Sequence, residues 1–295
     1  MRRLALFALL LSACPAPVEP DPEPVLPIER FPRTIGGDRP AEVLGPQEWR
    51  RDPPLPVVFL LHGFGASGLA QDLLFRLGDR VEERQFILVL PDGTQNEEGT
   101  RFWNATDACC DFTDTGVDDV GYLMGLLDEL EEDLGIGLDR GRVYFTGHSN
   151  GGFMSYRMAC EHPERVAAIA PLAGATWLSP ADCTVGDPVS VLHLHGDEDD
   201  DVPYFGDPDR HPGALESIQR WAGRAGCDLN AAEPVPNLDL LNSVDGDETV
   251  GQRYVAGCDA GITNEIWTLQ GVGHVPFFND EFANHLLDWL LQRRN

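Results

Sequence analysis

Short apolar segments alternate along the chain with segments in which apolar residues recur at helical spacing. Strands, most of them apolar runs of the kind buried in parallel sheets, are predicted at residues 57–61, 86–90, 142–146, 166–170, 189–195 and 265–269. Helices are predicted at residues 69–81, 120–134, 150–161 and 280–292. In the first of these, Leu69, Leu73, Leu77 and Val81 recur every four residues and would form one buried stripe. The alternation predicts an α/β fold with a mostly parallel sheet and helices on both faces.

One stretch does not follow this alternation. Residues 228–260 are acidic and rich in turn-forming residues, with no sustained apolar run. We therefore predict that this segment is an excursion from the sheet.

The N-terminus has the pattern of an export signal. Basic residues 2–3 precede an apolar run at 4–11 that is too short to span a bilayer as a stable helix. The run ends in Leu11-Ser12-Ala13-Cys14, which resembles the bacterial lipoprotein box. We expect a signal peptide at 1–14, lipidation of Cys14 and location outside the cell or on its envelope. The alternative is an ordinary signal peptide cleaved beside Cys14.

The next segment, residues 15–30, alternates proline with acidic residues. Repeated prolines exclude a helix or a central strand, so this segment is predicted to be an extended linker. The linker would precede a single globular domain at residues 31–295, which is long enough to bury a sizeable core.

The chain carries a formal net charge of −28. Such a surface repels phosphate backbones, so we expect no nucleic-acid partner. It also repels anionic lipid, so the one membrane contact we expect is through the lipid on Cys14. We expect the protein to be a monomer.

Cysteine usage agrees with export. The chain has seven cysteines, and removing Cys14 leaves an even number for disulfides in an oxidising compartment. Spacing leaves their connectivity open. No Cys-x-x-Cys pair is present, so a structural zinc site is not expected. The six candidates are Cys109, Cys110, Cys160, Cys183, Cys227 and Cys258.

The segment Gly147-His148-Ser149-Asn150-Gly151 matches the pattern G-x-S-x-G. It lies between a predicted strand and a predicted helix, where a tight turn raises a serine hydroxyl above the sheet. Glycines on either side prevent a collision of side chains in that turn. The pattern in this context predicts that Ser149 is a catalytic nucleophile.

A serine hydroxyl needs a base and an orienting acid, which follow the nucleophile in the order acid, then histidine. His274 lies between the last predicted strand and the last helix, where this arrangement puts its base. His193 and His195, at a strand end, and His285, within the last helix, are interpreted as structural.

The acid is expected in the loop after the strand at 189–195. Five acidic residues at 197–201 compete for that role, and spacing does not choose among them. Calcium binding is an alternative for so acidic a loop, but it lacks the EF-hand pattern and we expect no metal.

Two backbone amides are predicted to form the oxyanion hole, which stabilises the charge that develops on the substrate. One is that of Asn150, directly after the nucleophile. The other is that of Phe64, in the glycine-containing loop that follows the first buried strand.

Several further motifs accompany these residues and carry a family resemblance. They are Leu61-His62-Gly63, Pro91-Asp92-Gly93, Trp103-Asn104-Ala105 with Cys109-Cys110, Val117-Asp118-Asp119-Val120 and residues 147–160. Together they resemble the poly(3-hydroxybutyrate) depolymerase-type esterases, which are related to feruloyl and acetyl-xylan esterases. The resemblance covers residues 31–295 and implies an α/β-hydrolase fold and a serine esterase without a cofactor.

The resemblance also implies roles for particular residues. The family's acid lies in His-Gly-x-x-Asp-x-x-Val-Pro-Tyr, which selects Asp199 as the third member of a triad with Ser149 and His274. The resemblance further suggests a disulfide between Cys227 and Cys258. It pairs one of Cys109 and Cys110 with Cys160, and leaves Cys183 for the other.

One motif departs from the family. Relatives commonly read Gly-His-Thr-Trp-Pro-Gly at the catalytic histidine, whereas this chain reads Gly273-His274-Val275-Pro276-Phe277. An aromatic residue that contacts substrate is therefore missing or displaced. We predict hydrolysis of small or oligomeric carboxylic esters, of polyhydroxyalkanoate or feruloyl and aryl type. The alternatives are a serine peptidase on the same fold and a non-catalytic, lipid-tethered adhesion protein.

Overall fold

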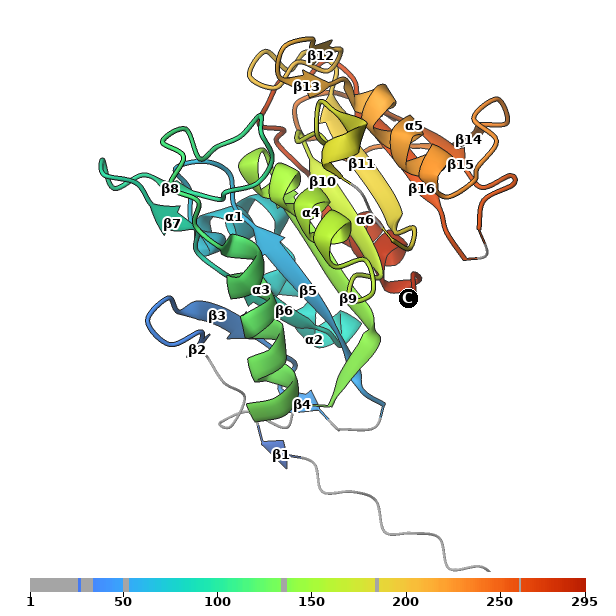
Figure 1. The fold of residues 1–295 in the computed structure, drawn as a ribbon. Helices are drawn as coiled ribbons and strands as arrows, with labels where there is room; N and C mark the ends of the chain where they lie inside the picture. Colours follow the sequence, from blue (N-terminus) through green and yellow to red (C-terminus); the bar gives the residue numbers. More distant parts are fainter. Residues whose placement is uncertain (1–25, 28–33, 50–52, 134–136, 184–185, 260) are drawn as a thin grey trace, which may run out of the picture.

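The computed structural model describes residues 26–27, 34–49, 53–133, 137–183, 186–259 and 261–295 (Figure 1). The predicted signal peptide, Cys14 and most of the predicted linker lie outside the described residues. No helix within the described ranges is both long enough and apolar enough to cross a membrane.

A ten-stranded sheet forms the centre of the molecule, in the order β14-β15-β16-β11-β10-β9-β5-β6-β3-β2 (Figure 1). Its six central strands are parallel, and each contains or overlaps a strand predicted from an apolar segment. They are β5 (Leu55–Leu61), β6 (Ile87–Leu90), β9 (Leu138–His148), β10 (Ala168–Leu172), β11 (Ser190–Gly196) and β16 (Asn264–Leu269). Every residue of β5, β6, β10 and β11 is buried, because helices cover both sheet faces.

Antiparallel strands complete both edges of the sheet. On one side these are β2 (Thr34–Ile35) and β3 (Ala41–Leu44), and on the other β14 (Glu233–Leu238) and β15 (Thr249–Tyr254). The prediction that residues 228–260 leave the sheet is therefore wrong. Strands β14 and β15 are not buried on both faces, so their sequences lack the continuous apolar run that marks a central strand. Prolines 234 and 236 are tolerated in β14 because that strand lies at the edge.

Helices cover both faces of the sheet, as predicted. On one face α3 (Asp119–Asp128), α4 (Asn150–Glu161) and α5 (Ala214–Arg224) share a core with side chains such as Phe59 of β5. On the other face α1 (Gly68–Phe75), α2 (Val81–Arg84) and α6 (Phe282–Leu291) pack against neighbouring side chains such as Val58. The strand residues alternate between the two cores, which places the sheet between two helical layers.

Short elements occupy the connections. The π-helix η3 (Glu129–Asp133) continues α3. The remaining ones are β1 (Leu26–Pro27), β4 (Glu48–Trp49), η2 (Gly78–Arg80), β7 (Thr94–Gln95), β8 (Arg101–Phe102), η4 (Pro180–Asp182), β12 (Gly206–Asp207) and β13 (His211–Pro212).

The predicted leucine stripe at 69–81 is not a single buried face. Leu69 and Leu73 are exposed, at 57% and 78%, because α1 turns its Gly68 and Phe75 side toward the sheet. The helix then ends at Arg76, which adopts the left-handed conformation. The later apolar residues of the stripe, Leu77 and Val81, are buried, but they lie beyond the end of α1.

Three disulfides bond all six candidate cysteines. Cys227 pairs with Cys258, as the resemblance suggested. The other suggested pairing is wrong, because Cys160 bonds to Cys183 and Cys109 bonds to its neighbour Cys110. The last turn of α4 faces the loop after η4, with Cα atoms of Cys160 and Cys183 5.7 Å apart, within the range of a disulfide. Sequence spacing carries no information about which loops meet in this way.

Candidate active site

The tight turn between β9 and α4 holds Ser149 in a backbone conformation that side chains rarely adopt, with φ 54° and ψ −119°. A Cβ at Gly147 or Gly151 would collide with the carbonyl oxygen of Leu61 on the adjacent strand. Glycine is therefore required at both positions. The amide of Ser149 donates to the carbonyl oxygen of Leu172 on the other neighbouring strand, 2.8 Å away. The local sequence thus forces the turn that the motif predicted.

Three side chains meet at this turn. His274 Nε2 lies 2.8 Å from Ser149 Oγ, and His274 Nδ1 lies 2.8 Å from Asp199 Oδ2. His274 follows β16 and Asp199 follows β11, so the carboxyl ends of neighbouring parallel strands bring them together. The structure therefore joins the three residues in the order that a serine, a base and an orienting acid require.

Asp199 is the buried carboxylate of the acidic loop at 197–201, with 4% of its surface exposed. Its Oδ1 accepts hydrogen bonds from the amides of Asp201 and Val202, at 3.0 and 2.8 Å. Burial raises the pKa of Asp199, but hydrogen bonds from His195, His274 and Val202 outweigh burial and hold that pKa well below its ordinary value. The carboxylate is therefore charged at neutral pH, as a partner of an imidazolium must be.

The two predicted oxyanion donors flank Ser149. Asn150 is the first residue of α4, and Phe64 lies in the loop after β5, where a Cβ on Gly63 would be 3.5 Å from the Cβ of Ser149. Among the described residues, neither the Phe64 amide nor the Asn150 amide donates to a protein acceptor. Both N–H groups are therefore available to a bound ligand.

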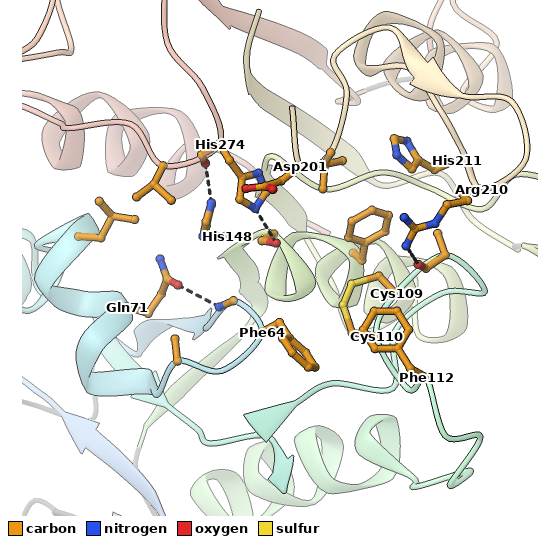
Figure 2. Close-up of a pocket in the computed structure, with 18 of the residues that line it drawn as sticks. Phe64, Gln71, Cys109, Cys110, Phe112, His148, Asp201, Arg210, His211 and His274 are labelled. Carbon is orange, nitrogen blue, oxygen red and sulfur yellow. Dashed lines mark hydrogen bonds between the residues drawn. A yellow bond between two sulfur atoms is a disulfide. The ribbon is translucent and has the colours of Figure 1, made fainter. Parts of the chain in front are cut away.

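Two side chains that sequence reasoning did not single out hold this arrangement. The side chain of Asn150 accepts from the amide of Trp103 at 2.7 Å and donates to its carbonyl at 2.9 Å. Gln71 Oε1 accepts from the amide of Gly63 at 3.1 Å (Figure 2). The position of Asn150 inside the serine motif was the one available signal, whereas nothing in the sequence pattern marks Gln71.

A cavity of about 660 Å³ opens onto Ser149. One wall is apolar and includes Phe64, Phe112 and the Cys109–Cys110 disulfide (Figure 2). Arg210 and His211 line the cavity beside the disulfide, and Arg210 donates to the carbonyl oxygen of Ala108 at 3.1 Å. Further lining residues include Leu74, Phe153, Val202 and Val275. The space is of the size that takes a small organic molecule.

The chain departs from the family motif at the residue that follows His274. Val275 lines the cavity and is 65% exposed, at the place where relatives carry a threonine before their tryptophan. Phe277 is also exposed, at 66%, but does not line the cavity. Aromatic character is instead supplied by Phe64 and Phe112, whose rings meet edge to face at 5.6 Å.

The histidines interpreted as structural lie in two places. His193 and His195 are buried on β11, and His195 Nε2 lies 3.3 Å from Asp199 Oδ2. His285 is half-buried on α6 and lines a separate cavity of about 270 Å³. His285 therefore has no contact with the serine site, whereas His195 does.

The chain is similar to known proteins that are named as esterases. A family model described as phospholipase/carboxylesterase matches residues 48–220, which include Ser149 and Asp199. Feruloyl esterase D of Neurospora crassa is 27% identical over 96% of this chain and 92% of its own length. The bifunctional acetylxylan esterase/xylanase XynS20E of Neocallimastix patriciarum is 25% identical over 84% of this chain. The chain spans only 33% of the length of that enzyme.

The solved structures include an acetyl xylan esterase from Aspergillus awamori with a TM-score of 0.62 and 17% identity, covering 88% of this chain and 98% of that one. This likeness shows the shared fold, a mostly parallel sheet between helical layers. The family match over more than half of the chain shows its membership. The chain belongs to the phospholipase/carboxylesterase family and has the α/β-hydrolase fold.

Proposed function

We propose that the chain hydrolyses carboxylic esters through an acyl-enzyme, with Ser149 as nucleophile, His274 as base and Asp199 as orienting acid. The observation that carries the proposal is the pair of 2.8 Å contacts that links the three side chains beside the cavity. Nucleophile, base and orienter within hydrogen-bond reach are what this chemistry needs.

Acylation begins when Ser149 Oγ attacks the ester carbonyl carbon while its proton moves to His274 Nε2. The carbonyl oxygen becomes an oxyanion, which accepts hydrogen bonds from the amides of Phe64 and Asn150. One such donor is worth roughly 3 kcal/mol of transition-state stabilisation. The charged Asp199 stabilises the imidazolium, whose proton then passes to the alkoxy oxygen as the ester C–O bond breaks and the alcohol leaves.

Deacylation repeats these steps with water. His274 Nε2 takes a proton from a water molecule as the water oxygen attacks the acyl carbon. The same two amides hold the second oxyanion. Its collapse breaks the bond to Ser149 Oγ, which takes back the proton, and the carboxylic acid is released.

The cavity favours an ester with an aryl acyl group, such as a feruloyl ester, over an aliphatic polyhydroxyalkanoate ester. Phe64, Phe112 and the Cys109–Cys110 disulfide form an apolar wall against which a planar ring can pack. Relatives named as feruloyl esterases support the same class. The polyester remains the second candidate, carried by the motifs at 103–105 and 147–160.

We propose further that the protein is exported and tethered to a membrane by a lipid on Cys14. The pattern Leu11-Ser12-Ala13-Cys14 and three disulfides in the domain support this. Mass spectrometry of the mature protein should find the N-terminal cysteine with acyl chains. Cys14→Ser should release the protein into the soluble fraction.

One set of assays tests the reaction and the substrate class. The protein and Ser149→Ala are compared on p-nitrophenyl esters of rising chain length, methyl ferulate, amorphous polyhydroxybutyrate and a peptide substrate. We expect hydrolysis of the esters, with methyl ferulate preferred over polyhydroxybutyrate, and a loss of at least about 10³-fold in the variant. Equal rates in both proteins would overturn the role of Ser149. Cleavage of the peptide alone would favour a peptidase.

A further inference from the structure

A hydrogen-bonded row of buried side chains lies behind the proposed acid. Tyr156 Oη is 2.7 Å from His193 Nδ1, and His193 Nε2 is 3.0 Å from His195 Nδ1. His195 Nε2 lies 2.8 Å from the carbonyl oxygen of Val202 and 3.3 Å from Asp199 Oδ2. Tyr156, His193 and His195 are each at most 1% exposed, so water does not compete for these contacts.

The elements that carry the nucleophile and the acid also carry this row. His193 and His195 are two residues apart on β11, so their side chains lie on the same sheet face, with ring centroids 5.3 Å apart. Asp199 follows the end of β11. Tyr156 lies on α4, two helical turns after Ser149. The row therefore ties the two catalytic elements together beneath the site.

If neither imidazole carries a charge, hydrogen-bond chemistry allows only one placement of protons along the row. The Val202 carbonyl and the Asp199 carboxylate can only accept, so His195 Nε2 must carry a proton. A neutral His195 then has a bare Nδ1, which must accept from His193 Nε2–H. His193 Nδ1 is bare in turn and accepts from the hydroxyl of Tyr156. Every donor in the row points toward Asp199.

The electrostatics of the row agree with this placement. Burial lowers the pKa of His193 well below its ordinary value, so that ring is neutral at neutral pH. Burial raises the pKa of Tyr156 well above its ordinary value, so the phenol keeps the proton that it donates. Neutral groups with aligned donors stabilise the carboxylate without adding a charge that would compete with His274.

We propose that His195 is a positioning residue, which holds the Asp199 carboxylate toward His274; this proposal rests on the proposed function. Tyr156 and His193 in turn hold the proton of His195 on Nε2. Asp199 Oδ2 then contacts His195 on one side and His274 on the other. Asp199 Oδ1 accepts hydrogen bonds from two backbone amides. Three hydrogen bonds fix the carboxylate, together with the 3.3 Å contact to His195 Nε2, which also donates to the Val202 carbonyl. The resulting orientation aims the carboxylate at the catalytic imidazole.

A matched pair of variants tests this role. In His195→Gln the side-chain amide nitrogen reaches the position of Nε2 and keeps a donor for Asp199. In His195→Asn the amide reaches only the position of Nδ1, so the contact with His193 is kept and the one with Asp199 is lost. We expect His195→Gln to keep kcat within about threefold, and His195→Asn to lose about tenfold or more, both with KM within about twofold. Equal losses in both variants would overturn the proposal.

A second comparison separates positioning from general packing. If His195 acts through Asp199, His195→Asn should lower kcat by less than about twofold in an Asp199→Asn background. A full tenfold loss in that background would assign the effect to packing instead. Ser149→Ala and Asp199→Asn are assayed alongside. If either variant keeps the wild-type kcat, the proposed triad is wrong. Equal losses in the two His195 variants would instead overturn only the proposed role of His195.

A measurement on the unaltered protein does not depend on whether the variants fold. In protein labelled with ¹⁵N-histidine, the nitrogen shifts and one-bond N–H couplings report which ring nitrogen carries the proton. We expect His193 and His195 to carry a proton on Nε2 and none on Nδ1. A proton on Nδ1 of either ring would overturn the proposed placement of protons.

Discussion

His148 donates a hydrogen bond from Nε2 to the backbone carbonyl oxygen of His274, 2.7 Å away (Figure 2). The two rings lie 4.6 Å apart between centroids. Because a carbonyl oxygen can only accept, the proton of His148 is on Nε2 and its Nδ1 is bare. The residue that precedes the proposed nucleophile therefore holds the backbone of the proposed base.

The burial of His148 makes the stability of the fold depend on pH. Burial, and then the charge of His274, lowers the pKa of His148 from 6.5 to about 4. The folded protein keeps the ring neutral, while the unfolded chain takes up a proton as the pH falls below 6.5. Stability from this group is therefore fully present above pH 6.5 and is lost as the pH falls toward 4.

His148→Gln removes the titration while its amide can still donate to His274. Between pH 7 and pH 5 we expect the wild-type protein to lose about 2 kcal/mol more of its free energy of unfolding than the variant. Urea unfolding at the two pH values measures this difference. The same pH dependence in both proteins would contradict the neutral, buried state of His148.

The glycines of the serine turn should be intolerant of a methyl group. A Cβ on Gly151 would lie 2.9 Å from the carbonyl oxygen of His62 and would collide with that of Leu61. Gly151→Ala should therefore lower the free energy of unfolding by about 2 kcal/mol or more. It should also reduce kcat by at least about tenfold, because it displaces Ser149.

Gly125→Ala is the matched control for that variant. Gly125 is exposed on α3, and a Cβ there would meet no heavy atom within 4 Å. The free energy of unfolding should rise by about 0.5–1 kcal/mol, because alanine restricts the unfolded chain, and kcat should not change. Thermal or urea unfolding gives both values. Equal effects of the two substitutions would refute the close approach at Gly151.

A buried ion pair should support the loops beside the site. Arg39 Nη1 lies 2.6 Å from Asp119 Oδ1, and the Asp119 side chain is fully buried and also accepts from the amide of Asn104 at 2.7 Å. Asp119→Ala leaves both donors without their acceptor, which should cost about 3 kcal/mol or more of the free energy of unfolding. Urea unfolding measures this loss.

The control for the ion pair is Glu233→Ala on strand β14. Glu233 pairs with Arg253 at 3.2 Å, but the two side chains are 52% and 40% exposed. Water screens such a pair, so its loss should change the free energy of unfolding by less than about 1 kcal/mol. If Asp119→Ala costs as little free energy of unfolding as Glu233→Ala, the burial of Asp119 adds nothing to the stability that the ion pair provides.

The features that were predictable from sequence depend on local constraints. The turn at Ser149 follows from the glycines around it, and the six central strands from apolar runs that burial on both faces requires. The position of His274 follows from the order of the strands. Asp199 needed the family resemblance as well, because five neighbouring carboxylates look alike in sequence and differ in burial.

The features that sequence reasoning missed depend on which distant segments meet. The strands β14 and β15 are not buried on both faces, so their sequences carry no strong strand signal. The row from Tyr156 to His195 joins a helix and a strand whose contact no spacing reveals. The partner of Cys160 is set in the same way, by the loop that packs against the end of α4.

The disulfides should therefore differ in what they contribute. Cys160–Cys183 closes a loop with a sequence separation of 23, whereas Cys109–Cys110 joins neighbours and closes no loop. Replacing Cys160 and Cys183 together with alanine should cost about 3 kcal/mol of the free energy of unfolding, through the entropy of the unfolded chain.

Replacing Cys109 and Cys110 together with alanine should cost less than about 1 kcal/mol, because no loop is opened. The same change removes part of the cavity wall beside Phe112, so KM for an aryl ester should rise, with kcat much less affected. Urea unfolding and steady-state kinetics on methyl ferulate test the two halves of this prediction. A large loss of stability with unchanged KM would show that this disulfide supports the fold and has no part in substrate binding.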